Sequence, residues 1–478
     1  MGADEASTGR RTLVPRLLSG PAAFAAVHAA PLTGLAPEAH FTVCAYAWVL
    51  AWWVTQPVPW IVASFLPFVL LPAGGVLPFS DVAAGYGHTV LPYLTGVMLF
   101  GHAFRKHGLA RRIALAALSL PGVARSGGGI VLALLVVSAV MSAVVSDLVV
   151  IVTMTPIALS IARSVAADAG RMATAASLAV LYGAAAGGLA TPAGILFNAL
   201  TLSLLERLTG YSVTFAQWTS TGVVLTAAQL PICYLVLKFM LLPEGRAISD
   251  GRALFQRQRA QLGPMSRAEK NVLFVLILML VLWVLPTFAT IAFLDIWYVP
   301  PVAMVLLFAL PADARRREAT LTAGDFQEGV AWNVLFLVLG GMALADVLAA
   351  TGFTDWLAAM LTAGVTAGAL PWLAGLVTPL LTQWANGAAT SIMVSTMLFP
   401  IADTLGYNPA ILARIIAGTA QAVALPWSSP AAAATFAFGA VGLGAMFRVG
   451  AVVTVLTSVV VIVVSMILIP ALGAFVAG

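Results

Sequence analysis

The sequence contains few charged side chains. Asp, Glu, Lys and Arg make up 9% of its 478 residues, against about 25% in an average soluble domain. Three long stretches contain none of these four residue types: Phe41 to Ser80, Ile415 to Phe447 and Val449 to Gly478. Each is longer than the roughly 20 apolar residues that cross a bilayer as a helix. This scarcity excludes a soluble fold and predicts an all-α polytopic membrane protein.

The groups that enzymes and metal sites commonly use are also sparse. The two cysteines, Cys44 and Cys233, lie in apolar segments far apart in the sequence, which excludes a disulfide framework. No HExxH or GxSxG motif occurs. The five histidines show no metal-ligand spacing and are expected near the ends of membrane spans: His28, His40, His88, His102 and His107. We therefore expect a protein that is not an enzyme.

The formal net charge of +5 comes mainly from basic residues in a few loops, which indicates membrane orientation rather than a nucleic-acid partner. The loops Glu244–Lys270 and Asp313–Glu318 are predicted to be cytoplasmic. Basic residues also mark the N-terminal segment as cytoplasmic or interfacial. We expect a multi-pass protein of the cell (inner) membrane, with the C-terminus outside the cytoplasm. Its predicted parts are an N-terminal segment 1–40, a first half 41–243, a cytoplasmic linker 244–270 and a second half 271–478.

The two halves share a weak internal repeat. At a constant offset, residues Val90, Leu91, Gly96, Met98 and Gly108 fall on Val334, Leu335, Gly340, Met342 and Gly352. The first copy continues into the basic residues 105–112, whereas the second copy has no basic residue there. Equivalent ends are therefore predicted to face opposite sides of the membrane, as in the inverted repeats of many secondary transporters.

Each half contains a predicted hairpin followed by a broken helix. Asp147 is the only Asp, Glu, Lys or Arg between Arg125 and Arg163, so the chain is expected to enter the membrane and return, with its tip at Ser146-Asp147. The second tip is expected near Asn386-Gly387. The expected ranges are hairpins at about 126–162 and 357–405, and broken helices at about 172–205 (interrupted at 187–194) and 409–447 (interrupted at 425–430).

Unwound backbone survives in a membrane only inside protein or beside a wet cavity. The polar side chains at these breaks are hydroxyls, amides and one carboxylate, which suit a light cation and an oxyanion. They are Ser142, Ser146, Asp147, Thr191, Asn198, Thr382, Asn386, Thr390, Ser428 and Ser429. No Lys or Arg lies among them. The sequence therefore predicts one cavity in which a small anion is held by neutral donors, helix ends and bound cations.

From Thr89 to Gly450, the chain resembles the divalent anion/sodium symporter (DASS) family of the ion transporter superfamily. That family has a Ser-Asn-Thr tip ten residues before a proline, where this chain has Ser146-Asp147-Leu148 before Pro156. Its glycine pair and Gly-Thr-Pro-Pro-Asn-like turn resemble Gly187, Gly188, Ala190, Thr191, Gly194 and Asn198. In the second half, the similar segments are 382–387 and 426–432.

The resemblance implies a fold of two inverted repeats with a scaffold and an elevator-type transport domain, in a homodimer. It implies Na⁺ ligands at Ser142, Ser146, Asp147 and Gly194, and at Thr382, Ala385, Asn386 and Ser428. Substrate contacts are expected from Ser146, Asp147, Asn386, Ser429 and Pro430, with Thr191, Asn198 and Thr390 nearby. Substrates of the family are di- and tricarboxylates and sulfate.

Asp147 stands where the family has an asparagine that faces the substrate. Three interpretations are open: Asp147 is protonated and the symport is coupled to H⁺, it binds a cation more tightly than asparagine, or the substrate is less negative. Cation-independent anion exchange and an arsenite-type or other ion permease are alternatives to symport. A channel is a further alternative, because re-entrant hairpins also line pores.

Overall fold

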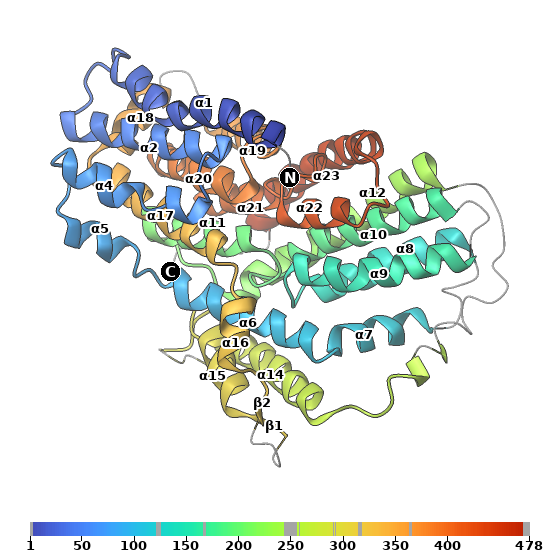
Figure 1. Ribbon diagram of the computed structural model, residues 1–478. Coiled ribbons are helices and arrows are strands. Elements are labelled where there is room, and N and C mark those ends of the chain that lie inside the picture. The colour runs from blue at the N-terminus through green and yellow to red at the C-terminus, as the bar shows by residue number, and fades with distance from the viewer. Residues whose placement is uncertain are drawn as a thin grey trace. The chain divides into compact units, whose positions relative to one another are not determined.

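The computed structural model describes residues 3–120, 126–165, 169–242, 256–257, 259–289, 291, 293–313, 318–362 and 366–471. Most of the expected linker, 243–255 and 258, and residues 314–317 of the second basic loop lie outside this range. The structure is 77% helical. Figure 1 shows the helices along the chain. The all-α polytopic prediction is confirmed.

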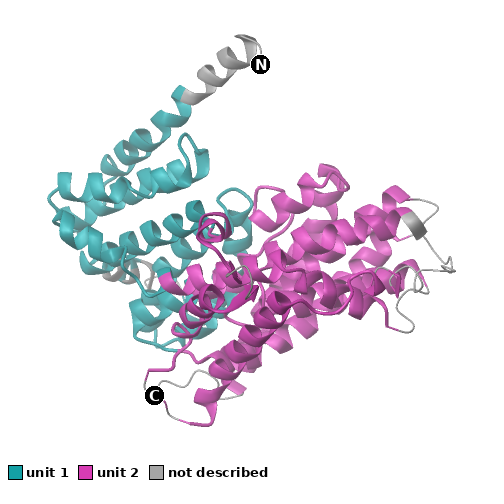
Figure 2. Ribbon diagram, turned by 60° about the horizontal axis from the view of Figure 1, so that its bottom comes forward, with its two compact units in different colours: residues 1–91, 200–212, 331–416 teal, residues 92–199, 213–330, 417–478 magenta. Residues whose placement is uncertain are grey.

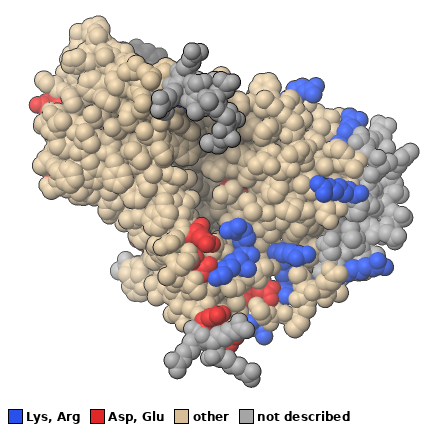
Figure 3. All heavy atoms as spheres, in the orientation of Figure 1, with Lys and Arg blue, Asp and Glu red and all other residues tan. Residues whose placement is uncertain are grey.

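Four of the described helices are long and apolar enough to cross a membrane: α12 (Phe215–Leu241), α14 (Arg267–Val284), which continues in a 3-10 turn (Leu285–Thr287), α17 (Trp332–Ala350) and α23 (Leu443–Ala471). Further apolar segments are shorter and include hairpin and half-helix elements. On the face drawn in Figure 3, uncharged residues cover most of the surface, and charged side chains gather in a few patches. This pattern is typical of a protein surrounded by lipid.

The chain divides into two compact units, coloured separately in Figure 2. Unit 1 comprises residues 1–91, 200–212 and 331–416. Its helices are α1 (Ala3–His28), α2 (Pro37–Thr55), α3 (Trp60–Ala63), α4 (Leu66–Ala73), α5 (Phe79–Gly85), most of α11 (Leu196–Thr209), α17, α18 (Phe353–Thr362), α19 (Leu370–Thr382), α20 (Gly387–Thr404) and most of α21 (Pro409–Thr419). A 3-10 turn, Ala367–Ala369, precedes α19. Within the unit, α20 packs against α17, α18 and α19.

Unit 2 comprises residues 92–199, 213–330 and 417–478. It holds most of α6 (Val90–Lys106), α7 (Leu109–Leu118), α8 (Gly127–Ser142), α9 (Asp147–Val165), α10 (Ala169–Gly188), the start of α11 (Leu196–Thr209), α12, α14, α15 (Val299–Ala309), α16 (Ala323–Gly329), α22 (Pro430–Ala437) and α23. Two short antiparallel strands, β1 (Pro311–Asp313) and β2 (Glu318–Ala319), form its only described sheet. Helix α10 packs against α8, α9 and α12.

Helix α10 approaches the hairpin closely because small residues face it. A Cβ atom at Gly183 would lie 2.2 Å from the Leu135 carbonyl oxygen, and one at Gly187 would lie 2.0 Å from that of Ala139. Only glycine permits this backbone approach, which is common between membrane helices. The first broken helix is thereby fixed against the first hairpin.

The two halves of the chain repeat the same order of elements. Helix α6 ends before Gly108 and is followed by the ten-residue helix α7, and α17 ends before Gly352 and is followed by the ten-residue helix α18. The two glycines, which the sequence offset aligned, have φ angles of 79° and 80°. Each half continues with a hairpin, α8–α9 or α19–α20, and a helix interrupted between α10 and α11 or between α21 and α22.

The helix bounds refine two of the expected ranges. In the second half, α18 ends at Thr362, inside the range expected for the hairpin, and the hairpin itself begins with α19 at Leu370. The second broken helix ends with α22 at Ala437, and α23 already begins at Leu443. Neither junction contains a charged residue that would mark a boundary in the sequence.

An ion pair between the exposed Lys106 and the buried Asp325 fixes the end of α6 to α16. Asp325 accepts hydrogen bonds from Lys106 Nζ at 2.6 Å and from the Thr322 backbone N–H at 2.7 Å, and its other oxygen lies 2.9 Å from His102 Nε2. Burial raises the pKa of the Asp325 carboxyl, but the hydrogen bonds from Lys106, Thr322 and His102 outweigh it and hold this pKa well below its usual value. The carboxylate is therefore ionised throughout the physiological pH range.

Candidate functional site

The first hairpin turns at residues 143–146, and its returning helix starts with an acidic side chain. Asp147 Oδ1 accepts a hydrogen bond from the Leu148 backbone N–H at 2.7 Å and from Ser146 Oγ at 3.3 Å. A carboxylate at the first residue of a helix is favoured by the helix dipole and by its unpaired N–H groups. The tip predicted at Ser146-Asp147 thus coincides with the N-terminus of α9.

A side chain that sequence reasoning missed holds the other carboxylate oxygen. Gln421 Nε2 donates to Asp147 Oδ2 at 2.9 Å. Gln421 follows α21 and belongs to the non-helical segment between α21 and α22. The available signal was that Gln421 is the only amide side chain in the uncharged stretch Ile415 to Phe447. The second broken helix therefore contacts the first hairpin tip within unit 2.

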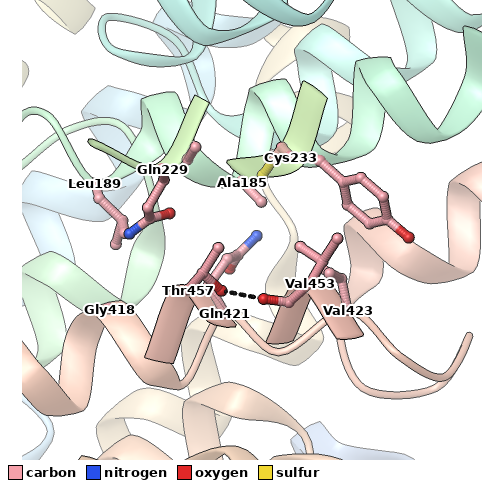
Figure 4. A pocket seen from close by; sticks show the side chains of 11 residues that line it. Ala185, Leu189, Gln229, Cys233, Gly418, Gln421, Val423, Val453 and Thr457 are labelled. Atoms are coloured by element: carbon pink, nitrogen blue, oxygen red, sulfur yellow. Dashed lines mark hydrogen bonds between the residues drawn. The ribbon is translucent and has the colours of Figure 1, made fainter. Parts of the chain in front are cut away.

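Gln421 also lines a small cavity. The cavity measures about 20 Å³ and is lined by Tyr182, Ala185, Ala186, Leu189, Gln229, Cys233, Gly418, Gln421, Val423, Val453 and Thr457. In Figure 4, Gln229 enters the cavity from α12 beside Leu189, and Thr457 on α23 and Gln421 line the opposite side. Gln229 Nε2 and Gln421 Oε1 are buried, and neither has a hydrogen-bond partner among the described residues. A cavity of this size holds one water molecule.

The first break is held together by two side chains from the predicted site. Asn198 Nδ2 donates to the carbonyl oxygens of Gly188, at 2.9 Å, and Thr191, at 2.7 Å. Thr191 Oγ1 donates to the Ala143 carbonyl oxygen at 2.5 Å. These contacts pair backbone oxygens that the interruption of the helix leaves free, as a hydrocarbon environment requires. They also attach the break to the hairpin turn.

Oxygen atoms gather where the break meets the end of α8. A Cβ atom at Gly194 would lie 2.4 Å from the Gly188 carbonyl oxygen and 2.6 Å from that of Ser142, so the glycine is required by close approach. Ser142 Oγ is buried and has no hydrogen-bond partner in the part of the chain described. Carbonyl and hydroxyl oxygens are the ligands that hard cations prefer. The donor set at Ser142 and Gly194 fits Na⁺.

The second break ends in a capped helix. Ser429 is buried, and its hydroxyl accepts a hydrogen bond from the Ala432 backbone N–H at 3.1 Å, with Pro430 at the first helical position of α22. Ser428 donates to the Leu425 carbonyl oxygen at 2.7 Å. Helix α22 packs against α9 and α10 in unit 2. The N-terminal N–H groups of α22 form an end at which anions are favoured.

The second hairpin tip belongs to unit 1. Asn386 has a φ angle of 25° and caps α20 by accepting a hydrogen bond from the Ala388 backbone N–H at 2.9 Å. Thr382 is buried and donates to the Thr378 carbonyl oxygen at 2.9 Å. Thr390 contacts the carbonyl oxygen of Ala385 at 3.4 Å. A positive φ in a residue other than glycine is uncommon and occurs often at functional positions.

The predicted residues thus fall into two groups. Unit 2 contains those of the first hairpin and of both breaks: Ser142, Ser146, Asp147, Thr191, Gly194, Asn198, Ser428, Ser429 and Pro430. Unit 1 contains Thr382, Ala385, Asn386 and Thr390. Sequence reasoning also passed over Arg414 on α21, whose side chain is completely buried in unit 1. A buried arginine in a membrane protein is rare and commonly functional.

The chain matches a known protein family over nearly its whole length. The family model described as "Sodium:sulfate symporter transmembrane region" matches residues 12–475. The chain is 27% identical over 460 residues to a protein of Staphylococcus saprophyticus named sodium-dependent dicarboxylate transporter SdcS, covering 91% of this chain and 87% of that protein. The protein of the same name from Staphylococcus aureus USA300 is 26% identical over 439 residues, covering 87% and 83%.

Two solved structures share the fold at low sequence identity. The Alcanivorax borkumensis YdaH transporter matches with a TM-score of 0.55 and 14% identity, covering 84% of this chain and 89% of that one. Neisseria gonorrhoeae MtrF matches with a TM-score of 0.57 and 14% identity, covering 86% of each chain. The family match extends over nearly the whole sequence, so the resemblance found in the sequence is confirmed. The chain belongs to the sodium:sulfate symporter (DASS) family of multi-pass membrane transporters, not to an enzyme family.

Proposed function

We propose that this chain is a secondary active transporter that moves small dicarboxylate or tricarboxylate anions together with Na⁺. The observation that carries the proposal is that both interrupted helices contact the tip of the first hairpin within unit 2. Thr191, in the first break, donates a hydrogen bond to the hairpin turn, and Gln421, in the second break, donates one to Asp147. Interrupted helices that meet at a tip supply both helix N-termini for an anion and free oxygens for a cation. The Staphylococcus relatives, named for sodium-dependent dicarboxylate transport, support this substrate class.

The proposed ligand sets are those that the family resemblance implies. The first Na⁺ is assigned to Ser142, Ser146, Asp147 and the Gly194 turn, where hydroxyl and carbonyl oxygens gather. By the family resemblance, the candidates for the second are Thr382, Ala385 and Asn386 in unit 1 and Ser428 in unit 2. The candidates for the anion are Ser146, Asp147, Ser429 and Pro430 in unit 2 and Asn386 and Thr390 in unit 1. Thr191 and Asn198 hold the first break in place within unit 2.

Bound cations would reduce the negative charge that Asp147 presents to the anion. Cation binding therefore raises anion affinity, and an inward Na⁺ gradient drives uptake. Each net charge moved across the membrane adds about 2.3 kcal/mol per 100 mV. Sulfate, which names the family model, is the alternative anion, because it carries the same charge in a smaller volume.

A second candidate is coupling to H⁺ through Asp147. The specific observation in its favour is a carboxylate at a hairpin tip, the only Asp, Glu, Lys or Arg between Arg125 and Arg163. A proton on Asp147 would remove the charge that opposes an anion. Proton coupling predicts uptake driven by an acidic exterior without Na⁺, whereas Na⁺ coupling does not.

We propose further that the protein is a homodimer in the cell membrane, with the N-terminus in the cytoplasm and the C-terminus outside it. The transport movement is assigned to an elevator-like displacement of a transport domain relative to a scaffold. The family resemblance supports the homodimer and the elevator movement. Light scattering of the purified protein measures its oligomeric state. Protease or thiol-reagent accessibility in oriented vesicles measures the orientation of the termini.

The deciding experiment is uptake of labelled succinate into proteoliposomes. Three gradients are compared at equal membrane potential: Na⁺ inward, H⁺ inward, and neither. Uptake driven by the Na⁺ gradient alone supports the principal proposal, and uptake driven by the H⁺ gradient alone supports the second candidate. Equal succinate exchange without any cation gradient would instead establish an anion exchanger, and flux that does not saturate would establish a channel.

A further inference from the structure

Three side chains that can bind a metal, none of them assigned to the proposed transport site, meet in unit 1. His28 is the last residue of α1, and His40 and Cys44 lie one turn apart on the same face of α2. One ligand atom from each residue can be chosen so that all three atoms lie within 4.8 Å of one another. This cluster has no recognisable sequence motif, because the connection between two helices separates the histidines.

The orientation of His40 leaves one ring nitrogen available as a ligand. His40 Nε2 lies 3.2 Å from the Val27 carbonyl oxygen. A carbonyl oxygen only accepts hydrogen bonds, so the hydrogen of the neutral ring is on Nε2 and the lone pair is on Nδ1. Metal-binding histidines usually donate their second ring N–H to a carbonyl or carboxylate in this way.

The two imidazole rings have a separation that suits one shared ion. The ring centroids of His28 and His40 lie 5.4 Å apart, and the rings are stacked with an angle of 16° between their planes. Because a ring nitrogen binds a metal in the plane of its ring, the exposed His28 side chain must turn about its bonds for both rings to share one ion. Two imidazoles bound to one tetrahedral zinc ion at about 2.0–2.1 Å would have ring centres roughly 5 Å apart. Ligand atoms around such an ion are separated by about 3.5 Å, so the three ligand atoms, now within 4.8 Å of one another, must also move closer together.

We propose that His28, His40 and Cys44 bind one divalent transition-metal ion of the zinc type. Two imidazoles and a thiolate suit zinc, whereas Mg²⁺ and Ca²⁺ require oxygen ligands. Binding replaces the S–H bond of Cys44 by a metal–sulfur bond and releases the proton to the buffer. Because His28 is exposed while Cys44 is buried, the fourth position of the ion faces solvent and takes a water molecule.

The ion would connect the end of α1 to α2. The two helices already pack against each other within unit 1, and the metal adds a fixed link near their connecting turn. The bound form of this helix pair is stabilised by the metal-binding free energy. This inference does not depend on the substrate or the coupling ion proposed above.

The first test is titration of the purified full-length protein, freed of its affinity tag and of metal, with Zn²⁺ alone. We expect one ion per chain and an upward shift of the melting temperature, with no effect of Mg²⁺. Replacing Zn²⁺ by Co²⁺ should give the intense thiolate-to-metal absorption of a Co–S bond. Absence of stoichiometric binding would overturn the proposal.

Variants assign the ligands. Cys44→Ser, His28→Asn and His40→Gln should each weaken Zn²⁺ binding at least about tenfold, and Cys44→Ser should abolish the thiolate absorption. Cys233→Ser and His107→Asn are matched controls that should bind as the parent protein does. The melting temperature without metal shows whether each variant is folded. Zn²⁺ binding that survives Cys44→Ser unchanged would also overturn the assignment.

Discussion

Asp147 and Gln421 are joined by a hydrogen bond of 2.9 Å although 274 positions separate them in the sequence. A carboxylate at a hairpin tip would otherwise be free to turn about its side-chain bonds. Its two oxygens are instead held by different groups, one by the N-terminus of α9 and one by the amide of Gln421. The pair therefore connects the first hairpin to the second broken helix.

Replacing Gln421 by Met should reduce transport about tenfold or more. The substitution keeps the length of the side chain but removes a donor to a charged group, and such hydrogen bonds contribute about 1.5–3 kcal/mol. Initial rates of anion uptake in proteoliposomes measure the effect. Gln229→Met, which alters the same cavity without touching Asp147, is the matched control and should retain most activity. Equal losses in both variants would show that the cavity rather than the Asp147 contact matters.

Asp147→Asn tests the coupling ion. If Asp147 carries a coupled proton, uptake by the parent protein increases toward acidic pH and the variant loses this dependence, because asparagine does not titrate there. If Na⁺ is the coupling ion, the variant should keep its Na⁺ dependence with an altered half-saturating concentration. Uptake is measured from pH 5 to 8 with and without Na⁺. An unchanged pH dependence would exclude Asp147 as the proton-binding group.

Asn386→Ala should abolish substrate binding without loss of folded protein. The change removes the amide that caps α20 and replaces a residue held at a positive φ angle. Asn386→Gly separates the two effects, because glycine adopts this backbone conformation without strain but supplies no amide. Anion-induced stabilisation against heating reports binding. Full binding by the glycine variant would mean that the backbone, and not the side chain, serves the site.

Gly194→Ala should raise the Na⁺ concentration needed for half-maximal uptake by about tenfold. The new methyl group would meet the carbonyl oxygens of Gly188 and Ser142, so the first break must shift, and overpacking of this kind costs about 1–3 kcal/mol. Gly442→Ala is the matched control, since a Cβ atom there has no neighbour within 4 Å. An unaltered Na⁺ dependence in Gly194→Ala would remove this turn from the proposed cation site.

Asp325→Asn should lower the stability of the protein at neutral pH, by about 1–3 kcal/mol for a buried hydrogen-bonded carboxylate. The folded pKa of Asp325 lies below the unfolded value of about 3.9. The stabilisation is therefore complete above that pH and is lost as the pH falls through the folded pKa. Melting temperatures of parent and variant should differ by a constant amount above about pH 5 and converge in stronger acid. The exposed Asp81→Asn substitution provides the control.

Much of the fold was predictable because charge and small residues determine where a chain can enter and turn in a membrane. The isolated carboxylate of Asp147 indicated the first tip, and the small residues from Gly187 to Gly194 indicated the first break. Both positions are non-helical in the structure or adjoin its helix ends. Boundaries such as the start of α19 were less predictable, because no charged residue marks the connection that precedes it.

The contacts of Gln421 and of the His28 cluster could not be predicted from sequence. Both depend on how helices far apart in the chain, or on either side of a turn, are rotated about their axes. A single glutamine or histidine in an apolar segment has no pattern that identifies its partner. The family motifs were informative about Thr191 and Gly194 because backbone conformation is encoded locally, whereas side-chain pairing between segments is not.

Gly108 and Gly352 give the two halves a corner of the same handedness. A side chain at either position would meet no atom within 4 Å, so no packing contact selects glycine there. The requirement comes from chirality alone, because an L-residue in this conformation costs about 1–2 kcal/mol. The surrounding residues of each half can therefore diverge freely while both corners stay alike, and these two glycines preserve a symmetry that the rest of the sequence has largely lost.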